Sequence, residues 1–164
     1  MTVRRITALD PGGTTGLATY GHDGLSAMQG SPDEILDQLE YSLKPFDWDE
    51  RPDIVVCESF TISMHTLKKS RGGSNAAIET IGAARYLCRR AGVPFRLQSP
   101  GEAKGFASDS VLRRVRWLPG LPDHARDAAR HLLLACVTEG LIPAEHLLPP
   151  EETGTLTTEG GSSG

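Results

Sequence analysis

Two short apolar segments of this chain each end in an acidic residue, and this pattern restricts the possible folds more than any other feature. Residues 3–10 read VRRITALD and residues 53–58 read DIVVCE, so Asp10 and Glu58 each follow a run of apolar side chains. The unbroken run of the second segment is typical of a strand that is covered on both faces. Open α/β sheets bind ligands at the carboxyl ends of their strands. Both acids are therefore predicted at the ligand-binding edge of an α/β sheet.

The order of the other segments completes the prediction of an α/β fold. Strands are predicted at 16–21 and 25–30, and the HDG turn between them makes an antiparallel meander with strand 3–10. Strands 53–58 and 93–98 then alternate with helices, which indicates parallel crossovers. The predicted helices span residues 32–44, 75–91, 99–107, 108–117 and 124–139. We expect a five-stranded mixed sheet, an antiparallel meander followed by parallel strands, flanked by helices.

The length and composition of the chain predict one globular domain. A chain of 164 residues can bury one full hydrophobic core but is too short for two ordinary domains. We expect this domain to span residues 1–142. Residues 143–164 carry several acids and few hydrophobic residues after Pro149, which predicts a flexible acidic tail.

Cysteine usage and hydropathy favour a cytoplasmic protein that does not enter a membrane. No apolar run approaches the ~18 residues that a membrane span needs. Cys57, Cys88 and Cys136 are far apart in apolar surroundings, and no CxxC pair is present. We interpret them as reduced core residues, not as metal ligands or a disulfide framework.

The charge is unevenly distributed along the chain. The net charge of the whole is −4, yet residues 68–116 contain eleven Lys or Arg against three acids, a net of +8. A basic middle within an acidic chain fits a surface that binds a polyanion. The alternative is a solvated helix face with scattered arginines.

A third acid occurs in the last predicted helix. His124, Asp127 and His131 have the spacing i, i+3 and i+7, which places them on one helix face. Leu132 and Leu133 are expected to face the core, with Ala129. Arg126 and Arg130 are expected on the outer side.

Each of these polar residues also has an ordinary structural explanation. Asp10 precedes Pro-Gly and can be a turn residue, and Glu58 can pair with an arginine. Asp123 is a natural N-cap of the helix. His131 can be a histidine at the solvent or at the edge of the core. Asp127 is the hardest to explain in this way.

Three carboxylates at the ends of three elements are the groups that metal-dependent phosphodiester cleavage needs. Two Mg²⁺ ions can activate a water and relieve charge on the leaving oxygen. Magnesium is a hard cation that prefers carboxylate oxygens. No thiolate cluster or HExxH motif points to zinc.

The segments DPGGTTGLATY, CESF and HARDAARHLLLA resemble the three active-site segments of the RuvC-type Holliday junction resolvases, within the ribonuclease H-like superfamily. The phage-encoded RuvC-like endonucleases look closest. The resemblance extends through GAARYLCRRAGVPFRLQSPGEAKGF and covers roughly residues 3–140.

This resemblance implies a ribonuclease H-like fold in which the first and fourth strands are neighbours. It implies a magnesium-dependent endonuclease with two ions per site, in which Mn²⁺ substitutes, and a homodimer that cuts branched DNA. The residues that match the family's metal ligands are Asp10, Glu58, Asp127 and, where many members carry an acid, His124. Asp123 and His131 stay alternatives for this fourth position.

Lys104 falls where the family has a basic residue near the scissile phosphate. The implied DNA contacts are Phe60, Lys68, Lys69, Arg71 and Lys104. Phe60 is close to the place of the aromatic residue that wedges the junction, although its offset from Glu58 is one residue short.

Other functions share parts of this pattern. A ribonuclease H-like enzyme that acts on RNA or on RNA–DNA hybrids would use the same acids. DPGGTTG also resembles the phosphate loop of actin-like ATPases, but these need two such domains. A non-catalytic DNA-binding or assembly protein is a further alternative, although such a descendant is expected to lose acids that this chain keeps.

Residues 61–74 are predicted to form a long loop with basic residues at its tip, and this basic loop gives the first testable prediction. Replacing Lys68 and Lys69 together by alanine should weaken DNA binding and reduce its salt dependence, because fewer counterions are released from the phosphates. Titration of the protein into labelled DNA at several salt concentrations measures this slope. A slope equal to that of the wild type would exclude these lysines as phosphate contacts.

Overall fold

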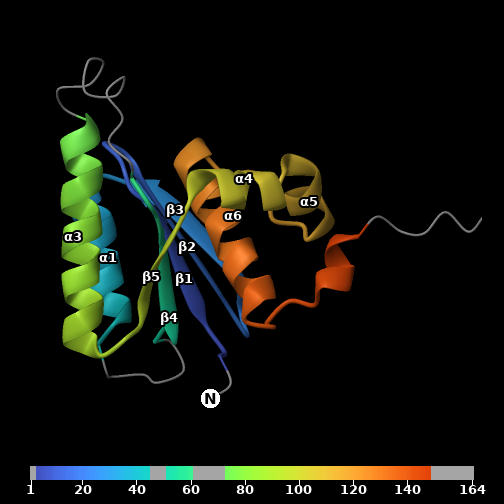
Figure 1. The fold of residues 1–164 in the computed structure, drawn as a ribbon, viewed down its shortest axis with the longest axis horizontal. Coiled ribbons are helices and arrows are strands. Elements are labelled where there is room, and N and C mark those ends of the chain that lie inside the picture. The colour runs from blue at the N-terminus through green and yellow to red at the C-terminus, as the bar shows by residue number, and fades with distance from the viewer. Residues whose placement is uncertain (1–2, 45–50, 61–72, 149–164) are drawn as a thin grey trace, which may run out of the picture.

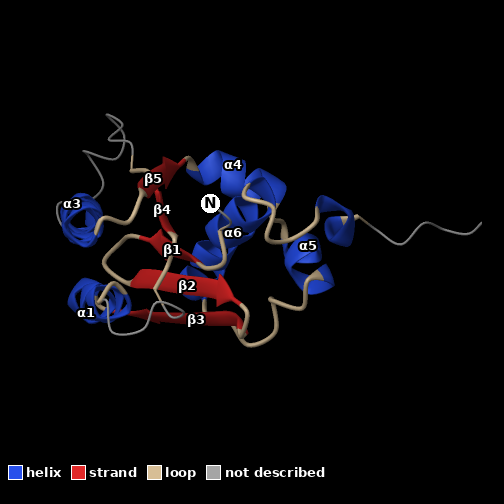
Figure 2. Ribbon diagram, turned by 90° about the horizontal axis from the view of Figure 1, so that it is seen from below, coloured by secondary structure: helices blue, strands red, loops and turns tan. Residues whose placement is uncertain are grey.

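The central element is a five-stranded mixed sheet with the order β3-β2-β1-β4-β5 (Figures 1 and 2). This computed structural model describes residues 3–44, 51–60 and 73–148. β2 pairs antiparallel with β1 and with β3, whereas β4 pairs parallel with β1 and with β5. The strands are β1 (Ile6–Asp10), β2 (Thr15–Gly21), β3 (Gly24–Gly30), β4 (Ile54–Glu58) and β5 (Phe95–Gln98). The predicted meander followed by parallel strands is confirmed.

Helices cover both faces of the sheet (Figure 2). α1 (Pro32–Ser42) and α3 (Gly73–Ala91) lie on one face, and α6 (Asp123–Thr138) crosses the other. The shorter α4 (Pro100–Phe106) and α5 (Asp109–Arg114) lie on the α6 side.

The central strands bury side chains on both faces, as the apolar run of residues 53–58 predicts. In β4, Ile54 and Val56 join the core beneath α6, whereas Val55 and Cys57 join the core beneath α1 and α3. This alternation follows from the two-residue period of a strand. Burial on both sides leaves the ends of β1 and β4 as the places where a polar side chain can emerge.

Local capping explains the starts of α1 and α4 and the ends of α3 and α6. Ser31 and Ser99 each close a capping box, with Glu34 and Glu102 respectively. Gly92 and Gly140 follow α3 and α6 at positive φ, the conformation that glycine adopts most easily. Asp123 is not the N-cap of α6: Pro122 occupies that position, and Asp123 begins the helix and pairs with Arg126.

The first residues beyond the predicted domain boundary belong to the fold. Ala144–Leu147 form a 3-10 helix, and the Arg114 guanidinium donates to the Leu147 carbonyl at 2.7 Å. The described structure therefore continues six residues past residue 142, to Leu148. The rest of the predicted tail, residues 149–164, lies outside the described residues.

The three cysteines are free and buried, in agreement with their interpretation as reduced core residues. Burial raises the pKa of the Cys88 and Cys136 thiols to about 12 and raises that of Cys57 further. They therefore stay protonated near neutral pH. No helix among the described residues has the length and apolar character of a membrane span.

The approach of α6 to the sheet depends on Gly16. A Cβ atom at this position would lie 1.9 Å from the carbonyl oxygen of His124 and 3.0 Å from the amide nitrogen of Ala125. Gly16 pairs with Asp10 across β1 and β2. Glycine therefore lets the backbone of the first turn of α6 rest directly on the strand beside Asp10.

This contact leads to a stability prediction. Gly16→Ala should lower the free energy of unfolding by roughly 3 kcal/mol, because backbone has to move to admit the methyl group. Urea denaturation measures the loss. Gly13→Ala is the matched control, since a Cβ there meets nothing within 4 Å. Equal stability of the two variants would show that α6 does not depend on this contact.

Candidate active site

Three acids from three elements meet at one edge of the sheet. Asp10 ends β1, Glu58 ends the neighbouring parallel strand β4, and Asp127 lies in α6. The negative charges of Glu58 and Asp127 both raise the pKa of Asp10, which shows that the three carboxyl groups interact. The family resemblance implies that the strands of Asp10 and Glu58 are neighbours, and β1 and β4 are paired in parallel.

Asp10 is the most buried of the three acids. Its residue is 7% exposed, and its Oδ2 lies 2.8 Å from His124 Nδ1. Burial raises the pKa of Asp10 most strongly, while the His124 hydrogen bond opposes this. The backbone N–H of His124 donates to the Gln29 side chain at 3.0 Å, which ties the start of α6 to β3. His124 is thus a direct partner of Asp10.

Glu58 has a buried partner that the sequence left undecided. His131 is 1% exposed, and its Nε2 lies 2.9 Å from Glu58 Oε2. Its Nδ1 lies 2.9 Å from Gln98 Oε1 on β5. His131 is therefore a buried member of the site, not a solvent histidine. The i+7 spacing from His124 was the signal for it, but no local pattern pointed to Gln98.

Asp127 is held by two cations. Lys104 Nζ on α4 lies 3.4 Å from Asp127 Oδ2, and Arg130 Nε lies 3.1 Å from Asp127 Oδ1. Lys104 therefore lies beside one of the three acids. Arg130 was expected on the outer side of α6, but its side chain is largely buried and also bonds Asp109 and the Ala107 carbonyl.

For the other predicted site residues, the described structure shows no contact with the three acids. Asp123 has a side chain that is 88% exposed and pairs only locally with Arg126. Phe60 is partly buried just beyond the end of β4. Lys68, Lys69 and Arg71 lie outside the described residues.

The donor chemistry of the cluster fits a hard divalent cation. It offers carboxylate oxygens, whereas the pKa of the neighbouring Cys57 thiol is raised by burial and then by Asp10 and Glu58, which disfavours a thiolate ligand. Burial raises the pKa of Asp10 most, and the nearby charges of Glu58 and Asp127 add a repulsion that a cation would relieve. Among the described residues, no three His, Cys, Asp or Glu side chains are already aimed at one ion, because the carboxylates bond the histidines, Lys104 and Arg130. A bound cation would therefore require exposed partners such as Lys104 and His124 to release the carboxylates that they contact.

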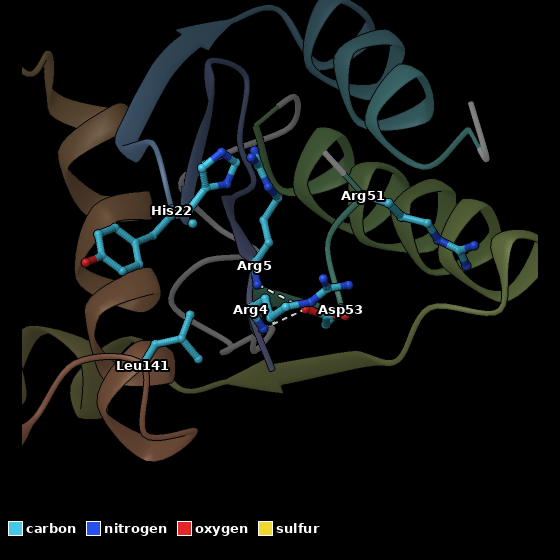
Figure 3. Close-up of a pocket in the computed structure, with 8 residues that line it drawn as sticks. Arg4, Arg5, His22, Arg51, Asp53 and Leu141 are labelled. Atoms are coloured by element: carbon cyan, nitrogen blue, oxygen red, sulfur yellow. Dashed lines mark hydrogen bonds between the residues drawn. The ribbon is translucent and has the colours of Figure 1, made fainter. Parts of the chain in front are cut away.

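A basic pocket of about 520 Å³ lies at the opposite end of β1 (Figure 3). Asp53 accepts hydrogen bonds from the backbone N–H groups of Arg4 and Arg5, at 2.7 and 3.0 Å. These bonds tie the start of β1 to the start of β4. Arg5 also pairs with Asp23 at 3.1 Å. These paired charges give the pocket a structural role. The candidate active site is therefore the group of Asp10, Glu58 and Asp127, called the acidic edge below.

Comparison with known proteins identifies the fold. No family model and no curated protein matches the sequence. Thermus thermophilus RuvC in complex with a Holliday junction substrate matches with a TM-score of 0.63 and 17% identity over 84% of this chain and 96% of that one. A second Thermus thermophilus RuvC structure matches with a TM-score of 0.55 and 18% identity, over 83% and 96%. The chain has the RuvC fold.

This likeness confirms the predicted ribonuclease H-like architecture. The match extends over 96% of the RuvC chain, and in this chain it includes the five-stranded mixed sheet. At such low identity, the RuvC likeness concerns the fold alone. The roles of individual side chains at the acidic edge therefore have to be argued from their own geometry.

The raised pKa of Asp10 predicts that this carboxylate lowers the stability of the protein at neutral pH. Folding raises the pKa of Asp10 above its ordinary value of 3.8. At a pH above the folded-state pKa, the ionised carboxylate therefore lowers the stability of the folded protein. This loss of stability disappears as the pH falls below 3.8. Asp10→Asn removes the charge. In EDTA at pH 7 it should raise Tm by a few degrees, and this gain should shrink in acid.

Thermal melts of both proteins between pH 7 and pH 4 measure this effect. Asp123→Asn, the same change at an exposed acid, should leave Tm almost unchanged. A lower Tm for Asp10→Asn at pH 7 would show that the His124 hydrogen bond outweighs burial and charge repulsion.

Proposed function

We propose that this protein is a magnesium-dependent endonuclease that cleaves phosphodiester bonds in branched DNA, as a Holliday junction resolvase does. The observation that carries the proposal is the meeting of Asp10, Glu58 and Asp127 at one edge of a sheet with the RuvC fold. The matching RuvC structure holds a Holliday junction substrate, which supports branched DNA as the ligand.

Each residue at the acidic edge has a role in this proposal. Asp10, Glu58, Asp127 and His124 would hold Mg²⁺, for which Mn²⁺ substitutes, at two ions per site. Bound magnesium would supply an activated water and offset charge at the phosphate. The side chain of Lys104 is about half exposed beside Asp127, so its ammonium can reach a phosphate oxygen while Asp127 holds it near the edge.

Contacts with DNA away from the acids are assigned to Phe60 and to the basic loop of Lys68, Lys69 and Arg71. A homodimer would present two acidic edges to one junction, and symmetric nicking needs two such sites. The nuclease domain in this proposal comprises residues 1–148, which extends the predicted 1–142 by the 3-10 helix that contacts Arg114. Residues 149–164 would form the acidic tail.

The test compares substrates and metals in one assay. Labelled four-way junction, linear duplex and RNA–DNA hybrid are incubated with the protein in Mg²⁺, Mn²⁺ or EDTA. The expected result is a pair of symmetric nicks in the junction, only with a divalent ion. Cutting of the hybrid instead would move the activity to the RNA-directed enzymes of this fold. Junction that stays intact would favour a binding or assembly protein.

Asp10→Asn in the same assay should abolish cutting and spare junction binding, because the amide keeps the size of the side chain but is a poor ligand for Mg²⁺. Gel-shift experiments in EDTA measure binding separately. Asp123→Asn is the control and should cut like the wild type, since Asp123 lies outside the acidic cluster. Normal cutting by Asp10→Asn would overturn the metal site.

A further inference from the structure

His131 is a buried histidine between two polar side chains, and the proposed reaction assigns it no role. Its Nε2 lies 2.9 Å from Glu58 Oε2 on β4, and its Nδ1 lies 2.9 Å from Gln98 Oε1 on β5. The residue is 1% exposed, and it is one of only a few polar residues that are buried within the described part of the chain. A polar ring at such a depth costs free energy unless both nitrogens are bonded, and here both are.

The chemistry of the two partners fixes the ring. An ionised carboxylate only accepts hydrogen bonds, so Nε2 of His131 must carry the proton that points at Glu58. The Gln98 amide can face Nδ1 with its oxygen or, turned over, with its nitrogen. Both amide orientations keep Nε2–H directed at Glu58. Gln98 thus holds the ring in place, and the ring holds one oxygen of the carboxylate.

The backbone makes this arrangement rigid. Gln98 lies opposite Glu58 in the parallel pairing of β4 with β5. The backbone N–H of Ser59 donates to the Gln98 carbonyl at 2.8 Å, so the residue after Glu58 is fixed to the same strand. His131 adds α6 to this pair of strands. Three elements therefore determine where Glu58 points.

The other histidine of the site differs in exposure. The side chain of His124, bonded to Asp10, is 43% exposed, whereas that of His131 is 1% exposed. His124 can turn toward a ligand, but His131 cannot reach DNA or solvent without unfolding part of α6. Its effect on a ligand must therefore pass through Glu58.

We propose that His131 and Gln98 are positioning residues that orient the Glu58 carboxylate to bind a divalent cation. This inference rests on the proposed metal-dependent function of the acidic edge. Glu58 Oε2 is held by the histidine, which leaves the other carboxylate oxygen to be presented at the edge. Outer partners of this kind set the orientation and the basicity of the ligand that they hold.

The experiment measures Mn²⁺ binding by electron paramagnetic resonance, without DNA. His131→Leu should weaken Mn²⁺ binding by about 10–100-fold, because Glu58 loses its donor. His131→Gln should restore most of the affinity, since its amide nitrogen can replace Nε2–H. Gln98→Leu keeps the backbone bond to Ser59 and should give a smaller loss. His22→Leu, at an exposed histidine beside the opposite end of β1, should bind like the wild type.

A second measurement follows junction cleavage at increasing Mg²⁺. The same variants should need more Mg²⁺ for half-maximal rate, while their affinity for the junction in EDTA stays unchanged. A normal Mg²⁺ requirement in His131→Gln, together with a raised one in His131→Leu, would separate a positioning role from a loss of folding. The Tm values of the variants test folding directly.

The outcomes distinguish this inference from the proposed function. Wild-type affinity for Mn²⁺ in a folded His131→Leu or Gln98→Leu would overturn the positioning role, even if the protein cuts junctions. Weakened Mn²⁺ binding in these variants, with rescue by His131→Gln, would support it even if the wild type cuts no branched DNA. A wild-type protein that binds no Mn²⁺ would overturn both.

Discussion

The backbone contact between Gly16 and the first turn of α6 is the constraint on which the acidic edge depends. Without a side chain at Gly16, the His124 carbonyl can lie over β2, next to the strand that ends in Asp10. The His124–Asp10 hydrogen bond needs this closeness, and so does the placement of Asp127 one turn later. A methyl group would push away the whole start of the helix, not only one side chain. The site is therefore specified partly by the absence of a Cβ atom at Gly16, the residue that pairs with Asp10 across β1 and β2.

The same closeness creates an electrostatic cost. Three carboxyl groups share one edge, and burial together with Glu58 and Asp127 raises the pKa of Asp10. Each acid has one or two hydrogen-bonding or charged partners from the α6 side of the sheet. These partners are His124 for Asp10, His131 for Glu58, and Lys104 and Arg130 for Asp127. These bonds offset part of the repulsion while keeping the oxygens together. A cluster of like charges that lowers the stability of the fold is typical of a binding site.

The sequence allowed the strands, the helices and the positions of the three acids along them to be predicted, because each depends on local patterns. Apolar runs that end in Asp10 and Glu58 define β1 and β4, and Ser31 and Ser99 begin helices through capping boxes. Apart from the N-cap of α6, which is Pro122 and not Asp123, the errors come from contacts between distant segments. Arg130 was expected outside α6, but the Asp109 carboxylate and the Ala107 carbonyl hold it inward. The partners of His131 depend on the register of β4 against β5, which no helical spacing reveals.

The two histidines show how one helix supplies two kinds of partner. His124 and His131 are seven residues apart, about 10 Å along the axis, and nearly on the same face. Because α6 crosses the sheet, its first turn lies by β2 and β3, where His124 meets Asp10, and its third turn reaches Glu58 and Gln98 on β4 and β5. Solvent reaches the first histidine and not the second. Similar chemistry at two depths therefore gives an exposed ring that can exchange partners and a buried ring that cannot.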